Sequence, residues 1–166
     1  MALKVGTSAP DFTLKTRSGG QNSDVRLSDN FGNHISVLLF FPGAFTNVCH
    51  QEMCDFTESL STYDRLNAKV YGISNDTPYC LEEWSKQLGI TFPLLGDFQK
   101  EVTEAYDVVW PNFSGLGPGC ARAVFVIDSG GVIRYSEQTP TLQDLPDYDA
   151  VEAAVRAIGD PSLHHS

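Results

Sequence analysis

The sequence is poor in positive charge. Its 166 residues include 11 lysines and arginines against 21 aspartates and glutamates, for a formal net charge of −10. Nucleic acids and anionic membrane surfaces would repel such a chain. The sequence also lacks any run of about 18 apolar residues, the length that a membrane-spanning helix requires. We therefore expect no nucleic-acid partner and no membrane partner.

Motifs for common cofactors and metals are missing as well. Gly115, Gly117 and Gly119 alternate with other residues, but no predicted strand precedes them and no predicted helix follows, so they do not form a dinucleotide-binding loop. The four cysteines include no C-x-x-C pair, and His34 and His50 have no partner at the spacing of metal ligands. We therefore expect no cofactor and no metal.

The cysteines point to redox chemistry rather than to a disulfide framework. The first ten residues lack the apolar core of a secretory signal, so the expected compartment is the cytoplasm. Cysteines stay reduced there unless they take part in a reaction. Cys49, Cys54, Cys80 and Cys120 are therefore expected to be redox groups or small buried residues.

Hydrophobic patterning predicts a single α/β domain over residues 1–166, with residues 159–166 as a flexible tail. Residues 9–14 and 25–28 flank a turn and predict an N-terminal hairpin. Apolar strands at 35–41 and 69–74 are joined by a helical pattern at 48–66, which predicts a right-handed crossover with parallel strands. Further helices are expected at 78–88, 100–106 and 147–158, and further strands at 92–95, 122–128 and 132–136.

The stretch that leads to Cys49 is the most informative part of the chain. A predicted strand ends at Phe41 and is broken by a proline and a glycine, after which Thr46 or Asn47 can cap a helix. Cys49 lies in the first turn, where unpaired N–H groups and the helix dipole favour thiolate over thiol. Taken alone, a cysteine at a helix start is more often a small buried apolar residue.

Further residues change that balance. Pro42, Thr46, Cys49 and Glu52, with Arg122 at the start of a later strand, resemble the signature of the peroxiredoxin family. The resemblance covers residues 5–158, and the segments 41–52 and 124–135 are most similar to the alkyl hydroperoxide reductase E branch. It implies a thioredoxin-like fold, with a central mixed sheet flanked by helices and an N-terminal hairpin extension. It also implies a peroxidase that reduces hydrogen peroxide and organic hydroperoxides.

The resemblance assigns a role to each signature residue. Cys49 would attack a peroxide oxygen and become a sulfenic acid. Arg122 would hold the peroxide oxygens with its fork of donors, and Thr46 would orient the peroxide. Pro42 would shield the pocket from water, and Glu52 would orient Arg122. Without the motif, Arg122 would be interpreted as a surface residue of a strand, and Glu52 is equally consistent with a solvated helix acid.

The other three cysteines are candidates for resolving the sulfenic acid. Cys54 ranks first because its spacing from Cys49 matches the bacterioferritin-comigratory branch. On an intact helix that spacing is about 7.5 Å along the axis, whereas the Cα atoms of a disulfide lie roughly 4.4–6.8 Å apart, so helical turns must unwind. Cys80, at the start of the next helix, ranks second, and Cys120, close to Arg122 in sequence, ranks third. A structural thiol is an equal alternative for each.

The resemblance further implies a thioredoxin-like or glutaredoxin-like reductant and a homodimer. Two other hypotheses stay open at this point. One is a thiol–disulfide exchange protein on a thioredoxin-like scaffold, which the missing C-x-x-C disfavours. The other is a redox sensor whose oxidation alters its assembly.

Overall fold

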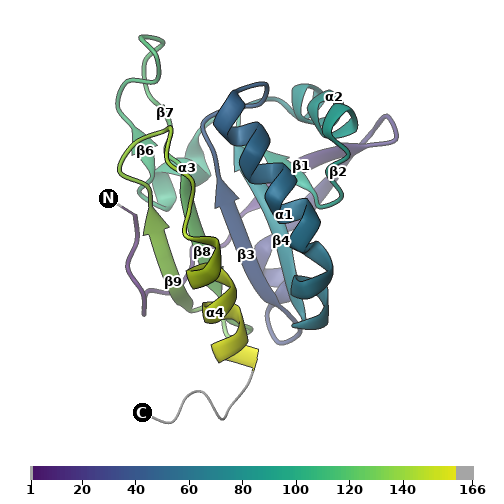
Figure 1. Cartoon of the computed structure of the whole chain (residues 1–166), viewed down its shortest axis with the longest axis vertical. Helices are drawn as coiled ribbons and strands as arrows, with labels where there is room; N and C mark the ends of the chain where they lie inside the picture. The colour runs from purple at the N-terminus through teal and green to yellow at the C-terminus, as the bar shows by residue number, and fades with distance from the viewer. Residues whose placement is uncertain (1, 160–166) are drawn as a thin grey trace.

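The computed structural model describes residues 2–159, which form a seven-stranded mixed sheet with helices on both faces (Figure 1). The strand order is β2-β1-β5-β4-β3-β8-β9, and β6 and β7 form a separate two-stranded ribbon. The strands are β1 (Thr13–Ser18), β2 (Gln21–Arg26), β3 (Ile35–Phe40), β4 (Ala68–Ser74), β5 (Leu94–Gly96), β6 (Val109–Trp110), β7 (Gly119–Cys120), β8 (Ala123–Ile127) and β9 (Ile133–Gln138). The helices are α1 (Asn47–Arg65), α2 (Pro78–Leu88), α3 (Glu101–Ala105) and α4 (Tyr148–Gly159), with a 3₁₀ turn at Leu27–Asn30.

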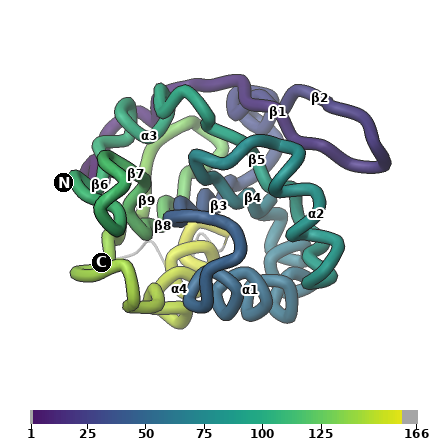
Figure 2. Tube along the Cα trace, turned by 90° about the horizontal axis from the view of Figure 1, so that it is seen from above, coloured from purple at the N-terminus to yellow at the C-terminus, as the bar shows by residue number. Residues whose placement is uncertain are grey.

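The predicted central mixed sheet flanked by helices is confirmed. All of β3 is buried, because the strand is covered on both faces and is apolar at nearly every position. Val37 and Leu39 pack in one apolar cluster with α1, α2 and α4, whereas Leu38 and Phe40 pack in a second cluster with α3. Figure 2 shows the same two layers, with α1 and α4 on one side of the sheet and α3 on the other.

The β3–α1–β4 crossover is confirmed in order and direction. β3 and β4 pair in parallel, with Val37 opposite Val70 and Phe40 opposite Ile73. Helix α1 returns over the sheet and buries Met53, Phe56 and Tyr63. This crossover places the start of α1 at the end of β3, where the chain leaves the sheet.

The N-terminal hairpin exists, but both of its strands lie closer to the turn in the sequence than predicted. They span Thr13–Ser18 and Gln21–Arg26 instead of 9–14 and 25–28. Gly19 and Gly20 both have positive φ, 59° and 78°, the conformation of the two-residue turn that matches the twist of a hairpin. That glycine pair sets the register. Ala9 and Phe12 are buried outside any strand, and only Thr13 and Leu14 of the predicted first strand belong to β1.

Helix α2 begins and ends where the sequence predicted. The Thr77 hydroxyl accepts a hydrogen bond from the Cys80 N–H at 3.3 Å, Pro78 occupies the first turn, and Gly89 ends the helix with φ of 69°.

Helix α4 ends at Gly159, so the tail predicted for 159–166 lies, apart from that residue, outside the described residues. Among residues 2–159, no helix is both long enough and apolar enough to cross a membrane.

Candidate active site

Cys49 lies in the first turn of α1 and has no exposed surface. Its helix starts directly after the loop of residues 42–46, which leaves the central strand β3 at its carboxyl end. Thr46 occupies the N-cap position with an extended backbone, but its side chain makes no cap hydrogen bond. Its hydroxyl donates to the carbonyl of Gly43 at 2.9 Å instead, so Thr46 closes the loop rather than caps the helix.

The guanidinium of Arg122 joins Cys49 to the rest of the site. One terminal nitrogen donates to the Cys49 sulfur at 3.2 Å, and the other donates to Glu52 Oε1 at 2.7 Å. The Leu142 carbonyl accepts two further bonds, from Nη2 at 2.8 Å and from Nε at 3.2 Å. Arg122 is 1% exposed, so the interpretation as a surface residue is wrong. It directly precedes β8 instead of starting it, and it alternates in phase with Val124 and Val126, which pack in the apolar cluster of α1.

Glu52 is fully buried one helical turn after Cys49, so the alternative of a solvated helix acid is also wrong. Burial raises the pKa of Glu52 to about 7, although the opposite charge of Arg122 and its hydrogen bond act against the rise. Its second oxygen, Oε2, has no hydrogen-bond partner. Burial works against the charge of Arg122, but Glu52 and Cys49 outweigh that effect and raise the pKa of Arg122.

The loop of residues 42–46 forms the remaining part of the site. Pro42 is buried at its start. Phe45 has φ of 65°, a left-handed conformation that is unusual for a bulky residue, and the residue is 55% exposed. That ring lies 6.3 Å from the ring of Trp84 in α2, which in turn lies 5.5 Å from Phe41. The loop is therefore held between α1 and α2.

The four cysteines have different surroundings, and all four are free thiols. Cys54 is half-buried within the intact helix α1, and Cys80 is half-buried in the first turn of α2. Burial raises the pKa of both thiols, with added repulsion from Asp55 and Glu58 at Cys54 and from Asp76 at Cys80. Cys120 is fully buried in the apolar cluster that packs α3, on the sheet face opposite Cys49. Burial raises the pKa of its thiol more than those of Cys54 and Cys80.

Sequence reasoning missed two parts of this arrangement. The Leu142 carbonyl, which holds Arg122, carries no side-chain signal. The contact between Ala44 and Asp76, in which the Ala44 N–H donates to Asp76 Oδ2 at 2.8 Å, joins a backbone group to an acid that no signature includes. Within residues 2–159, no group of three or more His, Cys, Asp or Glu side chains is arranged to hold a metal ion.

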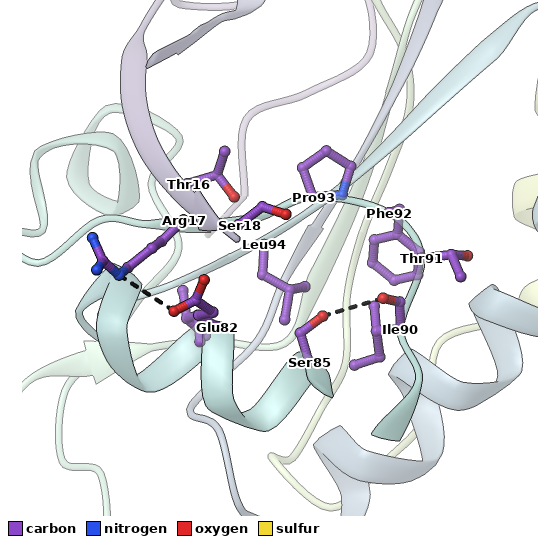
Figure 3. A pocket seen from close by; sticks show the side chains of 11 residues that line it. Thr16, Arg17, Ser18, Glu82, Ser85, Ile90, Thr91, Phe92, Pro93 and Leu94 are labelled. Atoms are coloured by element: carbon purple, nitrogen blue, oxygen red, sulfur yellow. Dashed lines mark hydrogen bonds and ion pairs between the residues drawn. The ribbon is translucent and has the colours of Figure 1, made fainter. Parts of the chain in front are cut away.

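A separate cavity of about 200 Å³ lies between the β1–β2 hairpin and α2 (Figure 3). At its rim, Arg17 and Glu82 form an ion pair at 3.3 Å, and Glu82 also accepts the Gly20 N–H at 3.0 Å. The cavity is lined by no cysteine. The two contacts of Glu82 therefore fix the hairpin to α2 beside this cavity.

Comparison with known proteins identifies a family and relatives that match most of the chain. The model of the AhpC/TSA family matches residues 5–136, a range that includes Pro42, Thr46, Cys49, Glu52 and Arg122. Alkyl hydroperoxide reductase E of Mycobacterium tuberculosis is 36% identical over 138 residues, covering 81% of this chain and 85% of that protein. Mouse peroxiredoxin-2 is 33% identical over 162 residues, covering 93% of this chain and 77% of that protein.

Solved structures match the fold over nearly the whole chain. The crystal structure of peroxidoxin BcpB from Mycobacterium tuberculosis superposes with a TM-score of 0.81 at 28% identity, covering 94% of this chain and 98% of that one. The reduced 2-Cys peroxiredoxin of Plasmodium vivax gives a TM-score of 0.83 at 25% identity, covering 93% and 81%. The thioredoxin-like fold expected from the sequence is confirmed by these matches together with the strand order.

Proposed function

The chain belongs to the AhpC/TSA family of peroxiredoxins and is a thiol-dependent peroxidase, and from that premise we propose that Cys49 is the thiol that attacks the peroxide. The observation that carries this proposal is the 3.2 Å hydrogen bond from Arg122 to the Cys49 sulfur. Within residues 2–159, Cys49 is the one cysteine whose sulfur accepts a hydrogen bond from an arginine. A cationic donor at this distance stabilises a negatively charged sulfur.

In the proposed reaction, the Cys49 thiolate attacks one peroxide oxygen, and the O–O bond breaks. A sulfenic acid forms on Cys49, and the other oxygen leaves as hydroxide or alkoxide and takes up a proton. The Thr46 hydroxyl uses its proton on the Gly43 carbonyl, so its lone pairs are left to accept the O–H of a hydroperoxide. Arg122 supplies donors to the peroxide oxygens, Glu52 orients Arg122, and Pro42 excludes water.

We propose hydrogen peroxide and organic hydroperoxides as substrates, and a thioredoxin-like or glutaredoxin-like protein as reductant. The mostly exposed ring of Phe45 supports the organic substrates, because it offers an apolar surface beside the loop. A homodimer, a cytoplasmic location and a single domain over residues 1–166 complete the proposal. One sheet that takes strands from Thr13 to Gln138 supports the single domain.

For recycling, we keep Cys54 as the first candidate, Cys80 as the second and Cys120 as the third. Cys54 shares α1 with Cys49, so a bond between them requires the first turns of α1 to unwind. Cys80 is half-buried on α2, one helical turn before Trp84, which contacts the loop through Phe45. Cys120 ranks last because it has no exposed surface and packs in the other apolar cluster.

The test is rapid-mixing oxidation of the reduced protein by hydrogen peroxide, followed by mass spectrometry of each cysteine. Wild-type protein is expected to form a sulfenic acid first at Cys49, and Cys49→Ser is expected to abolish turnover. Cys120→Ser is expected to form the Cys49 sulfenic acid as the wild type does, since Cys120 is a candidate for resolution and not for the attack on the peroxide. Full peroxidase turnover by Cys49→Ser would overturn the proposal. Rapid oxidation of Cys49 without turnover under any reductant would instead favour the redox sensor.

A further inference from the structure

The loop that precedes Cys49 is held by an acid from outside the peroxide site. Asp76 lies in the turn between β4 and α2. Its Oδ2 accepts two hydrogen bonds, one from the Ala44 N–H at 2.8 Å and one from the Ser74 hydroxyl at 2.7 Å. Ser74 is fully buried at the end of β4, so its hydroxyl fixes the carboxylate in the orientation that receives Ala44.

The conformation of the loop requires such a contact. Phe45, directly after Ala44, has φ of 65°, and a left-handed conformation costs a residue with a side chain about 1–2 kcal/mol. Strained backbone of this kind persists only where surrounding contacts hold it in place. Two contacts enclose Phe45 along the chain: Asp76 holds Ala44 on one side, and the Thr46 hydroxyl returns to Gly43 on the other.

The turn that carries Asp76 is tightly packed against β5. Gly96 of β5 lies directly behind it, since a Cβ at Gly96 would come within 2.8 Å of the Asp76 carbonyl oxygen and within 2.9 Å of Pro78. No side chain fits between the turn and β5. The packed turn therefore holds the Asp76 carboxylate in place, and the carboxylate in turn holds the loop relative to Cys49.

We infer that Asp76 is a positioning residue for peroxide reduction, which holds the loop of residues 42–46 so that Thr46 faces the peroxide beside Cys49. The inference rests on the proposed role of Cys49. It adds a residue from the β4–α2 turn to a site that is otherwise built from the loop, α1 and Arg122. Because misplacing a reacting geometry by about 1 Å can lower a rate by about 100-fold, loss of this contact acts on the rate of oxidation.

The test compares three variants by the second-order rate constant for oxidation of Cys49 by hydrogen peroxide. Asp76→Ala removes the acceptor and is expected to lower this constant about 10- to 100-fold. Asp76→Asn keeps an oxygen that accepts both bonds and is expected to recover most of the rate. Asp128→Ala is the matched control. Asp128 also accepts backbone N–H groups in a turn, from Gly130 and Val132, but at the opposite end of β8 from Arg122.

All rates are measured where circular dichroism shows fully folded protein, so a loss of folded fraction does not count as a loss of rate. An unchanged rate in Asp76→Ala, or an equal loss in Asp128→Ala, overturns the inference. If Asp76→Ala does not fold, Ser74→Ala decides: a slower oxidation in folded protein supports the inference, and a wild-type rate contradicts it. Failure of the proposed function is a different result, because wild-type Cys49 would then not be oxidised.

Discussion

Glu52 and Arg122 form an ion pair at 2.7 Å that is closed to solvent on both sides. The two residues differ in how fully their polar atoms are hydrogen-bonded. Arg122 has further acceptors in Cys49 and in the Leu142 carbonyl, whereas Glu52 leaves one buried oxygen without a partner. Such a carboxylate is a costly choice for stability alone, since burying a charge without full hydrogen bonding is unfavourable. Its hydrogen bond holds Arg122 beside the Cys49 sulfur, as the proposed orienting role of Glu52 requires.

Arg122→Ala is expected to abolish most of the peroxidase activity and to destabilise the protein. Removing one partner of a buried ion pair typically costs about 3–5 kcal/mol, because the other charge stays buried and unpaired. The double variant Arg122→Ala with Glu52→Gln is expected to regain part of the stability without regaining activity. Urea unfolding and peroxide oxidation rates measure the two effects separately. Activity that returns with stability in the double variant would show that Arg122 acts only through folding.

Glu52 is expected to make stability depend on pH between about 4.5 and about 7. Because burial raises the pKa of Glu52 from 4.5 to about 7, the folded state binds a proton more tightly than the unfolded state in this range. The stabilisation is present below pH 4.5 and is lost as pH rises through 7. Relative to Glu52→Gln, the free energy of unfolding of the wild type should fall by at most about 3 kcal/mol across the range. Urea unfolding of both proteins measures this change. A free energy of unfolding of the wild type that rises with pH relative to that of Glu52→Gln would contradict the assignment.

The three candidate resolving cysteines are expected to differ in their effect on helix content. If Cys54 resolves Cys49, oxidation unwinds the first turns of α1, and the far-ultraviolet circular dichroism of the oxidised protein loses helical signal. Cys54→Ser would then keep the signal, whereas Cys80→Ser and Cys120→Ser would lose it as the wild type does. Peptide mass spectrometry identifies the linked pair. A lone sulfenic acid at Cys49 with no bridge in the wild type would exclude all three candidates.

Phe45→Gly is expected to be more stable than Phe45→Ala by about 1 kcal/mol, because alanine keeps the cost of positive φ and glycine does not. Both variants lose the contact with Trp84, so the comparison isolates the backbone. Leu116 provides the control, since it is exposed and has no positive φ. There, glycine should be no more stable than alanine. Urea unfolding of the four variants gives the comparison, and equal stabilities of the two Phe45 variants would show that the loop relaxes without Phe45.

The side chains of the site could be predicted from the sequence, but the groups that position them could not. Cys49 follows a strand break and a helix start that the sequence shows, and the resemblance to the peroxiredoxin signature predicts that Glu52 and Arg122 lie with it, as they do. The Leu142 carbonyl leaves no such pattern, because every residue carries the same backbone acceptor. Asp76 has the composition of an ordinary turn residue, and only the folded chain brings it to Ala44.

The fold shows the same division. The crossover from β3 to β4 could be predicted because two continuous apolar runs, typical of buried strands, flank a segment whose apolar residues recur at helical spacing. The predicted first hairpin strand begins four residues before β1, because Ala9 and Phe12 are apolar and buried although they lie outside any strand. An apolar residue in a polar stretch indicates burial, and burial does not require a strand.

The unbroken helix α1 has a consequence for how turnover responds to heat. Cys49 and Cys54 both lie within its 19 residues. A cycle that passes through a bond between them includes a partial unfolding step in every turnover. Unfolding steps carry large activation enthalpies, so the resolution rate would rise several-fold for each 10 °C, far more steeply than attack by an external thiol on an intact helix. An Arrhenius plot of resolution would therefore distinguish the two cycles without any substitution in the chain.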